Sequence, residues 1–194
     1  MALMLTFDDG LVSFAREAMP RLTRFGFAAT LFVVAGRLGG HADWPGRQTM
    51  APVERLLDRP ALVEIASAGV EIGAHAVTHQ RLSSLLPDVA AREVLDSRAR
   101  LEDALGRPVR SFAYPYGDAP IGIARLVREQ FAAGFGIRLA WASPASRLET
   151  IERIDAYYLR KRASLALLDG WPSRAVLSAR SGLRALRRAS GYGS

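Results

Sequence analysis

The chain has 194 residues, of which 49% are hydrophobic, and this suits one globular domain with a sizeable core. It contains no cysteine, which excludes disulfides and thiolate metal sites, so any metal must be held by His, Asp or Glu. The net charge of +7 does not indicate a nucleic-acid-binding protein, because residues 1–160 carry 19 basic and 18 acidic side chains, whereas residues 161–194 carry 7 basic and 1 acidic.

No stretch of about 20 residues is apolar enough to cross a bilayer. Residues 1–5 lead directly into a polar motif and lack the charged start and the cleavage site of a signal peptide. These features predict a cytoplasmic protein. Residues 161–194 form a basic C-terminal tail in which apolar and arginine residues recur at helical spacing. We expect a helical tail that either packs on the domain or makes a peripheral contact with an anionic membrane surface.

Short apolar runs alternate along the chain with segments of helical hydrophobic spacing. In chain order, the expected elements are a strand at 2–7, a helix at 11–25, a strand at 27–34, a loop at 36–52, a helix at 53–68 interrupted near Pro60, a strand at 70–74, a helix at 87–105, a strand at 109–114, a helix at 121–133, and strands at 137–142 and 151–158. Apolar strands that alternate with helices indicate an α/β fold with a parallel sheet covered on both faces. An open sheet and a barrel both fit, and both gather functional residues at the carboxyl ends of their strands.

Two polar clusters follow predicted strands at the same edge of this sheet. Asp8 and Asp9 come directly after the first strand, where Asp-Asp-Gly would also serve as turn and helix-capping chemistry. His75 and His79 follow the strand at 70–74; two imidazoles on one helical turn can bind one cation, although histidines also occur in satisfied polar networks. Because strand ends meet at one edge, we expect one aspartate and both histidines to form a three-ligand site with an open position, the arrangement of catalytic zinc. The other aspartate is then available as a base.

The strand at 109–114 delivers a third cluster, Tyr114 to Asp118, to the same edge. Its Tyr-Pro-Tyr-Gly segment could simply be an aromatic-rich turn. The functional interpretation is a rigid turn that presents the backbone N–H of Tyr116 toward a developing oxyanion. In that interpretation, Tyr114, Pro115 and Asp118 contact the substrate.

With all three clusters in view, the sequence resembles the polysaccharide deacetylases with a NodB-like domain. Thr6–Gly10 matches the first motif of that family, Gly69–His79 matches its His-[Ser/Thr]-x-x-His motif with the preceding strand, and Phe112–Gly117 matches the third motif in the variant FAYPYG. The resemblance covers residues 3–159, and it implies a distorted (β/α) barrel of the NodB-like type for a domain at residues 1–160.

The resemblance also implies roles for the motif residues. Asp9, His75 and His79 would hold a divalent metal, usually zinc, and Asp8 would be the general base. The backbone N–H of Tyr116 would contribute to the oxyanion hole. The implied partner is an N-acetylated sugar polymer or oligosaccharide rather than nucleic acid, and nothing in the sequence indicates an oligomeric state.

The sequence departs from the family where the leaving amine would be protonated. The usual C-terminal Leu-x-His is absent, and the one histidine outside the motifs is His41, so the base itself could have to return the proton. Ala76 replaces a serine or threonine that often braces the metal loop, and Ala113 replaces an arginine that often orients the base. Arg153 and Asp155 stand near the next strand end and could assist, although a surface ion pair is the interpretation that we favour.

These features favour metal-dependent hydrolysis of the N-acetyl group of an N-acetylhexosamine, in a polysaccharide such as an exopolysaccharide or in its lipid-linked precursor. That reaction cleaves a C–N bond other than a peptide bond. Two alternatives keep the same fold: an O-acetyl esterase or small-molecule amidase, and a non-catalytic carbohydrate-binding relative that has lost its general acid. Glycoside hydrolysis is less favoured, because its two carboxylates face each other across the scissile bond at about 5–9.5 Å, whereas Asp8 and Asp9 are neighbours in the chain.

Overall fold

The computed structural model describes residues 3–45 and 52–159. Within them, the strands are β1 (Leu5–Phe7), β2 (Ala29–Val33), β3 (Glu71–Ala74), β4 (Ser111–Ala113) and β5 (Ala133–Phe135). The α-helices are α1 (Met19–Phe25), α2 (Arg59–Ser67), α3 (Pro87–Leu105) and α4 (Ile121–Gln130). A π-helical turn precedes α1 at Phe14–Ala18, and 3-10 turns lie at Leu82–Ser84, Pro115–Gly117 and Ala156–Leu159.

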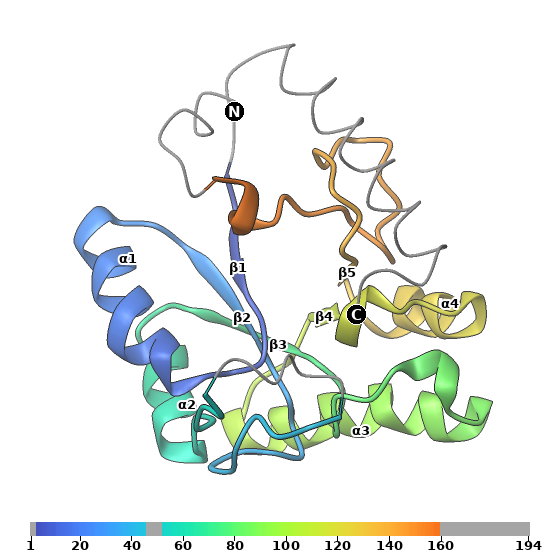
Figure 1. Ribbon diagram of the computed structural model, residues 1–194, viewed down its shortest axis with the longest axis horizontal. Coiled ribbons are helices and arrows are strands. Elements are labelled where there is room, and N and C mark those ends of the chain that lie inside the picture. The colour runs from blue at the N-terminus through green and yellow to red at the C-terminus, as the bar shows by residue number, and fades with distance from the viewer. Residues whose placement is uncertain (1–2, 46–51, 160–194) are drawn as a thin grey trace.

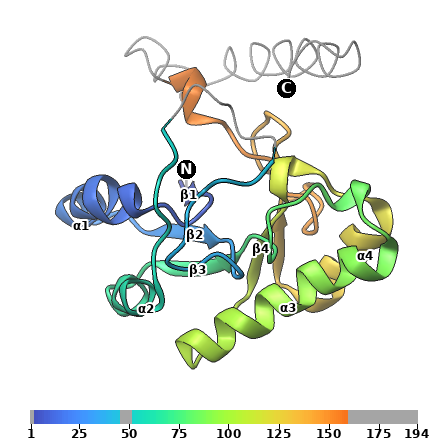
Figure 2. The ribbon, with the colours of Figure 1, turned by 60° about the horizontal axis from the view of Figure 1, so that its bottom comes forward.

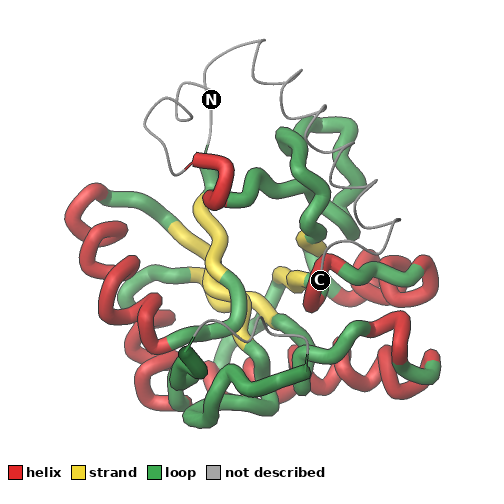
Figure 3. Tube along the Cα trace, viewed as in Figure 1, coloured by secondary structure: helices red, strands yellow, loops and turns green. Residues whose placement is uncertain are grey.

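The five strands form one parallel sheet in the order β1-β2-β3-β4-β5. The sheet curls, and the helices α1 to α4 lie around its outer face (Figures 1, 2 and 3). This half-barrel is the distorted (β/α) barrel that the sequence predicts. Its parallel strands bring every strand's carboxyl end to one rim.

Alternate residues of the buried strands pack on opposite faces of the sheet, as the period of two requires. In β2, Leu31 and Val33 belong to the main core between the sheet and the helices, whereas Phe32 packs with Phe135 on the concave side, 5.3 Å between ring centroids. The helices complete the main core with fully buried side chains, Leu62, Val94, Leu101 and Val127. Burial of each such side chain contributes about 1.5–3 kcal/mol, so the rim is built on a stable frame.

Two helices show how terminal residues set helix boundaries. The bounds of α3 are those predicted, because Pro87 fits the first turn and Gly106 ends the helix with a left-handed φ of 66°. The helix α2 begins later than predicted. Asp58 caps it by accepting a hydrogen bond from the Ala61 N–H at 3.0 Å, and Pro60 stands in its first turn. Pro60 therefore starts this helix and does not interrupt a longer one.

The strand predicted at 137–142 is wrong, since β5 follows α4 almost directly. Gly134 makes this strand possible: its N–H donates to the Leu148 carbonyl at 2.7 Å, and a side chain there would collide with the carbonyl oxygen of Glu149. The last predicted strand is reduced to a bridge, in which Ile151 pairs in parallel with β5. The returning chain thus lies against the edge of the sheet and extends the half-barrel.

Among the described helices, none combines the length and the apolar character that crossing a bilayer requires. The tail predicted at 161–194 lies outside the described residues. Its helical character and its membrane contact therefore stay predictions, as does the domain boundary at residue 160.

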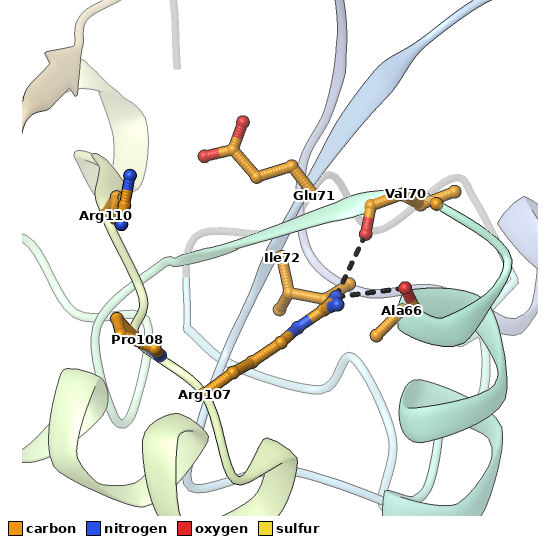
Figure 4. Close-up of a pocket in the computed structure, with 8 residues that line it drawn as sticks. Ala66, Val70, Glu71, Ile72, Arg107, Pro108 and Arg110 are labelled. Carbon is orange, nitrogen blue, oxygen red and sulfur yellow. Dashed lines mark hydrogen bonds between the residues drawn. The ribbon is translucent and has the colours of Figure 1, made fainter.

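A surface hollow lies at the amino ends of β3 and β4, opposite to the rim that carries the motifs (Figure 4). Arg107 lines it and donates to the carbonyl oxygens of Ala66 at 3.1 Å and Val70 at 3.4 Å. These bonds satisfy carbonyl groups at the end of α2 and just before β3. Arg107 therefore serves the framework, because it ties the helix to the strand that carries the histidine motif.

Candidate active site

The three motif clusters lie together at the carboxyl ends of β1, β3 and β4. The Oδ1 atom of Asp9 is 3.5 Å from His75 Nε2 and 3.3 Å from His79 Nε2, and the two Nε2 atoms are 3.2 Å apart. Tetrahedral zinc with bonds of about 2.0–2.1 Å holds neighbouring ligand atoms about 3.3–3.4 Å apart. The spacing of these three atoms therefore fits one tetrahedral cation, and all three are groups that can bind a metal ion.

The motif turns adopt left-handed backbone conformations that glycine usually supplies. In the described part of the chain, the non-glycine residues with positive φ are Asp9, Ala76, His79 and Tyr116. Such a conformation costs about 1–3 kcal/mol per residue, and all four residues belong to the three motifs. Gly10, with φ of 77°, follows Asp9 directly, and a side chain there would crowd β2. Backbone strain that clusters in this way is typical of functional sites, where the positions of the side chains are maintained at a cost in folding stability.

The hydrogen bond of His75 sets which of its ring nitrogens faces the site. Its Nδ1 atom lies 2.7 Å from the carbonyl oxygen of Ala113. Because a carbonyl oxygen only accepts, Nδ1 carries the hydrogen. In the neutral ring, Nε2 then presents its lone pair toward Asp9, which is the tautomer that a metal ligand needs.

Burial and charge act in opposite directions on these ionisable groups. Burial raises the pKa of Asp9, but its hydrogen bonds and charge interactions with both histidines outweigh this and lower the pKa well below its usual range. Burial lowers the pKa of His75, but its bond to Asp9 and the charges of Asp8 and Asp9 outweigh burial and raise it. For His79, burial and the neighbouring His75 dominate and the pKa is lowered, despite the bond to Asp9. His75 is thus the group on which a proton competes with a cation.

Aromatic side chains enclose the His79 ring. Trp44, from the loop after β2, lies 4.2 Å away between ring centroids at 31°, and Tyr116 meets the ring edge-on at 4.8 Å. The Tyr116 hydroxyl donates to the carbonyl of Pro45 at 2.6 Å and ties the third motif to the same loop. Among the described residues, His79 Nδ1 is buried without a hydrogen-bond partner. The His79 ring is therefore oriented by packing against these rings, whereas the His75 ring is oriented by the hydrogen bond of its Nδ1 atom.

Arg153 binds Asp8 and is not part of a surface ion pair, contrary to the sequence-based interpretation. Its two terminal nitrogens lie 2.7 and 2.9 Å from the two carboxylate oxygens of Asp8, and its Nε donates to the Gly136 carbonyl at 2.9 Å. The Arg153 side chain is only 15% exposed, and its guanidinium also lies over the Phe32 ring. A planar, two-bond contact of this kind fixes the carboxylate plane. The signal in the sequence was Ala113, which stands where the family that the sequence resembles often has an arginine.

The residues expected to contact substrate divide between the core and the rim. Tyr114 is 1% exposed and its hydroxyl donates to the Glu149 carbonyl at 2.7 Å, so its side chain belongs to the core and offers no substrate contact. Pro115 is buried as well and starts the 3-10 turn. Asp118 is partly exposed and accepts a hydrogen bond from the Ser83 N–H at 2.7 Å. This bond links the loops after β3 and β4 at the rim.

The N–H of Tyr116, the expected oxyanion donor, belongs to a residue with φ of 58° and ψ of 10°. The hydrogen bonds of this turn run from Gly117 N to Tyr114 O at 2.8 Å and from Asp118 N to Pro115 O at 3.1 Å. None of the described hydrogen bonds uses the Tyr116 N–H. The donor is therefore free to bind a ligand oxygen.

Comparison with known proteins shows the family and the fold of this chain. A family model described as polysaccharide deacetylase matches residues 1–132. Among curated proteins, YxkH of Bacillus subtilis strain 168, whose name assigns it to the polysaccharide deacetylases, is 27% identical over 114 residues. That match covers 59% of this chain and 36% of YxkH, so the matched segment is about a third of that relative.

The solved structures that share the fold include the following two. The deacetylase PplD of Streptococcus pyogenes, in complex with acetate, superposes with a TM-score of 0.67 and 26% identity over 78% of this chain and 62% of PplD. IcaB of Ammonifex degensii superposes with a TM-score of 0.66 and 28% identity over 78% of this chain and 66% of IcaB. The chain thus spans less than two thirds of either structure.

Proposed function

Because this chain belongs to the polysaccharide deacetylase family, we propose that it hydrolyses the N-acetyl group of an N-acetylhexosamine, in a polysaccharide or in its lipid-linked precursor. The observation that carries the proposal is the spacing of Asp9, His75 and His79 around one point, with Asp8 held beside them by Arg153. Acetate, which occupies the similar PplD, is the product that this reaction releases.

Asp9, His75 and His79 would hold the metal, and zinc is the ion that two imidazoles and one carboxylate suit best. When bound, a zinc ion supplies a polarised acetyl carbonyl and a water whose pKa falls toward about 7. The hydrogen bond from His75 Nδ1 to Ala113 keeps the other ring nitrogen in position for this role.

Asp8 acts as the general base and takes the proton of the attacking water. Both of its oxygens bind Arg153, and this two-bond contact holds the carboxylate in one orientation. The Tyr116 N–H donates to the oxyanion that develops on the acetyl group, an effect worth about 3–4 kcal/mol per well-placed donor.

The proton for the leaving amine comes from Asp8, which returns the proton that it has taken. His41 does not offer an alternative, because it is exposed and lies in an isolated bridge with Arg55, with no described contact to the motif residues. Asp118, at the rim, remains the candidate among the described residues for a substrate hydroxyl contact.

The test combines metal analysis of the purified protein with acetate release from N-acetylglucosamine oligomers. We expect about one zinc per chain and release of acetate from these oligomers. Release from O-acetylated sugars alone would identify an esterase. Bound zinc with no acetate from either panel would support the non-catalytic carbohydrate-binding alternative.

A further inference from the structure

The loop between His75 and His79 belongs to no helix or strand, so no regular backbone hydrogen bonds fix its conformation. Ala76 and His79 have φ of 62° and 63°, so both ends of the loop are strained. On one side, the turn after β2 runs along the loop and donates to its carbonyl groups, from Ala35 N to Ala76 O at 3.0 Å and from Gly36 N to Val77 O at 2.9 Å. These bonds leave the N–H groups of the loop to be satisfied by something else.

Glu93 of α3 accepts three hydrogen bonds from this loop. Its Oε2 accepts from the N–H of Val77 at 2.9 Å and of Thr78 at 2.8 Å, and its Oε1 accepts from the Thr78 hydroxyl at 2.9 Å. The carboxyl group thus reaches both residues at the centre of the loop. It connects the histidine motif to the longest helix of the described chain.

The position of Glu93 is unusual for a charged residue. It is 8% exposed and lies on the core face of α3, together with buried Ala90, Val94, Ser97 and Leu101. Among the described residues, no arginine, lysine or histidine forms a salt bridge with it. A carboxyl group in such surroundings is costly unless hydrogen bonds compensate, and the three loop donors are the described groups that do so.

We propose that Glu93 is a positioning residue that sets the distance and orientation of His75 and His79, and thereby the affinity of the site for zinc. The inference rests on the proposed function, because it concerns the metal of that site. Groups that support metal ligands from outside the coordination shell typically change metal affinity about 10–100-fold when they are replaced.

The variant Glu93→Gln tests this directly. The amide oxygen of glutamine can still accept from both N–H groups, but without the negative charge these hydrogen bonds are roughly half as strong, and the NH2 group donates to the Thr78 hydroxyl, from which the carboxylate accepted. We expect zinc affinity, measured by competition with a chromophoric chelator, to fall about 10–100-fold. Thr78→Val keeps both backbone bonds to Glu93 and removes the hydroxyl bond, together with the exposed bond that the hydroxyl accepts from Gln80 at 3.1 Å, and it should give a smaller loss in the same direction.

Glu102→Gln is the matched control. Glu102 is also on α3 and also accepts a backbone hydrogen bond, from Val109 N at 3.0 Å, but it does not contact the histidine loop. The unfolding midpoint of the metal-free protein is measured for each variant. The expected pattern is that Glu102→Gln keeps wild-type zinc affinity even if it lowers that midpoint.

Two results would overturn the inference alone: wild-type affinity in Glu93→Gln, or an equal loss of affinity in Glu102→Gln at the same loss of stability. A wild-type protein that binds no zinc would instead overturn the proposed metal site, and the inference with it.

Discussion

Replacing Arg153 with methionine should lower kcat strongly while the metal site stays intact. Methionine keeps an unbranched apolar side chain over Phe32 but removes both bonds to Asp8, at 2.7 and 2.9 Å, and the bond to the Gly136 carbonyl. Asp8 is about a third exposed, so water replaces the lost partner and the carboxylate can rotate. No described interaction joins Arg153 to the proposed metal ligands, Asp9, His75 and His79.

The magnitude follows from what the base contributes. A positioned general base is worth about 10²–10⁴-fold in rate, and a misplacement of about 1 Å costs about 10²-fold. We therefore expect kcat to fall about 10²–10³-fold, or about 2.7–4 kcal/mol in activation free energy, with KM nearly unchanged. Arg153→Lys keeps the charge but loses the two-bond contact, so its kcat should lie between those of the wild type and of Arg153→Met.

The assay measures kcat and KM separately by acetate release, with zinc content determined for each variant. Arg138→Met is the control, because Arg138 pairs with Glu152 near the same segment and is 70% exposed. The reasoning would be refuted if Arg153→Met kept wild-type kcat, or if it raised KM alone, since orientation of the base acts on the chemical step.

Three further predictions follow from the same geometry. Asp8→Asn should abolish turnover with zinc retained, whereas His79→Ala should lose zinc; equal zinc loss in both variants would make Asp8 a ligand. Because the pKa of His75 is raised above its ordinary value, protons should compete with zinc from above pH 6.5 downward, and the apparent affinity should fall by up to about tenfold per pH unit. A chelator titration that shows the same affinity at pH 8 and pH 5.5 would contradict this. If the basic tail contacts anionic lipid, full-length protein should sediment with anionic vesicles at low salt and a version ending at Leu168 should not; the hypothesis fails if both stay in the supernatant.

The sequence by itself determined the elements whose causes are local. Helix α3 has its predicted bounds because Pro87 and Gly106 act within one turn of the chain. The convergence of Asp9, His75 and His79 could also be predicted, since parallel strands carry whatever follows them to one rim. That argument needs only the order of strands and helices, and it does not depend on distances within the site.

Tertiary structure decided the contacts between residues far apart in the chain. Arg153 meets Asp8 across 145 positions, and Glu93 meets the histidine loop because one turn of α3 passes beside it. Tyr114 follows a strand end like its neighbours, yet its hydroxyl bonds to Glu149 inside the core. The strand β5 depends on Gly134, whose missing side chain lets a later segment approach. Hydrophobic periodicity fixes only which face of an element is buried, and the partner that a buried polar group finds there depends on how the elements pack.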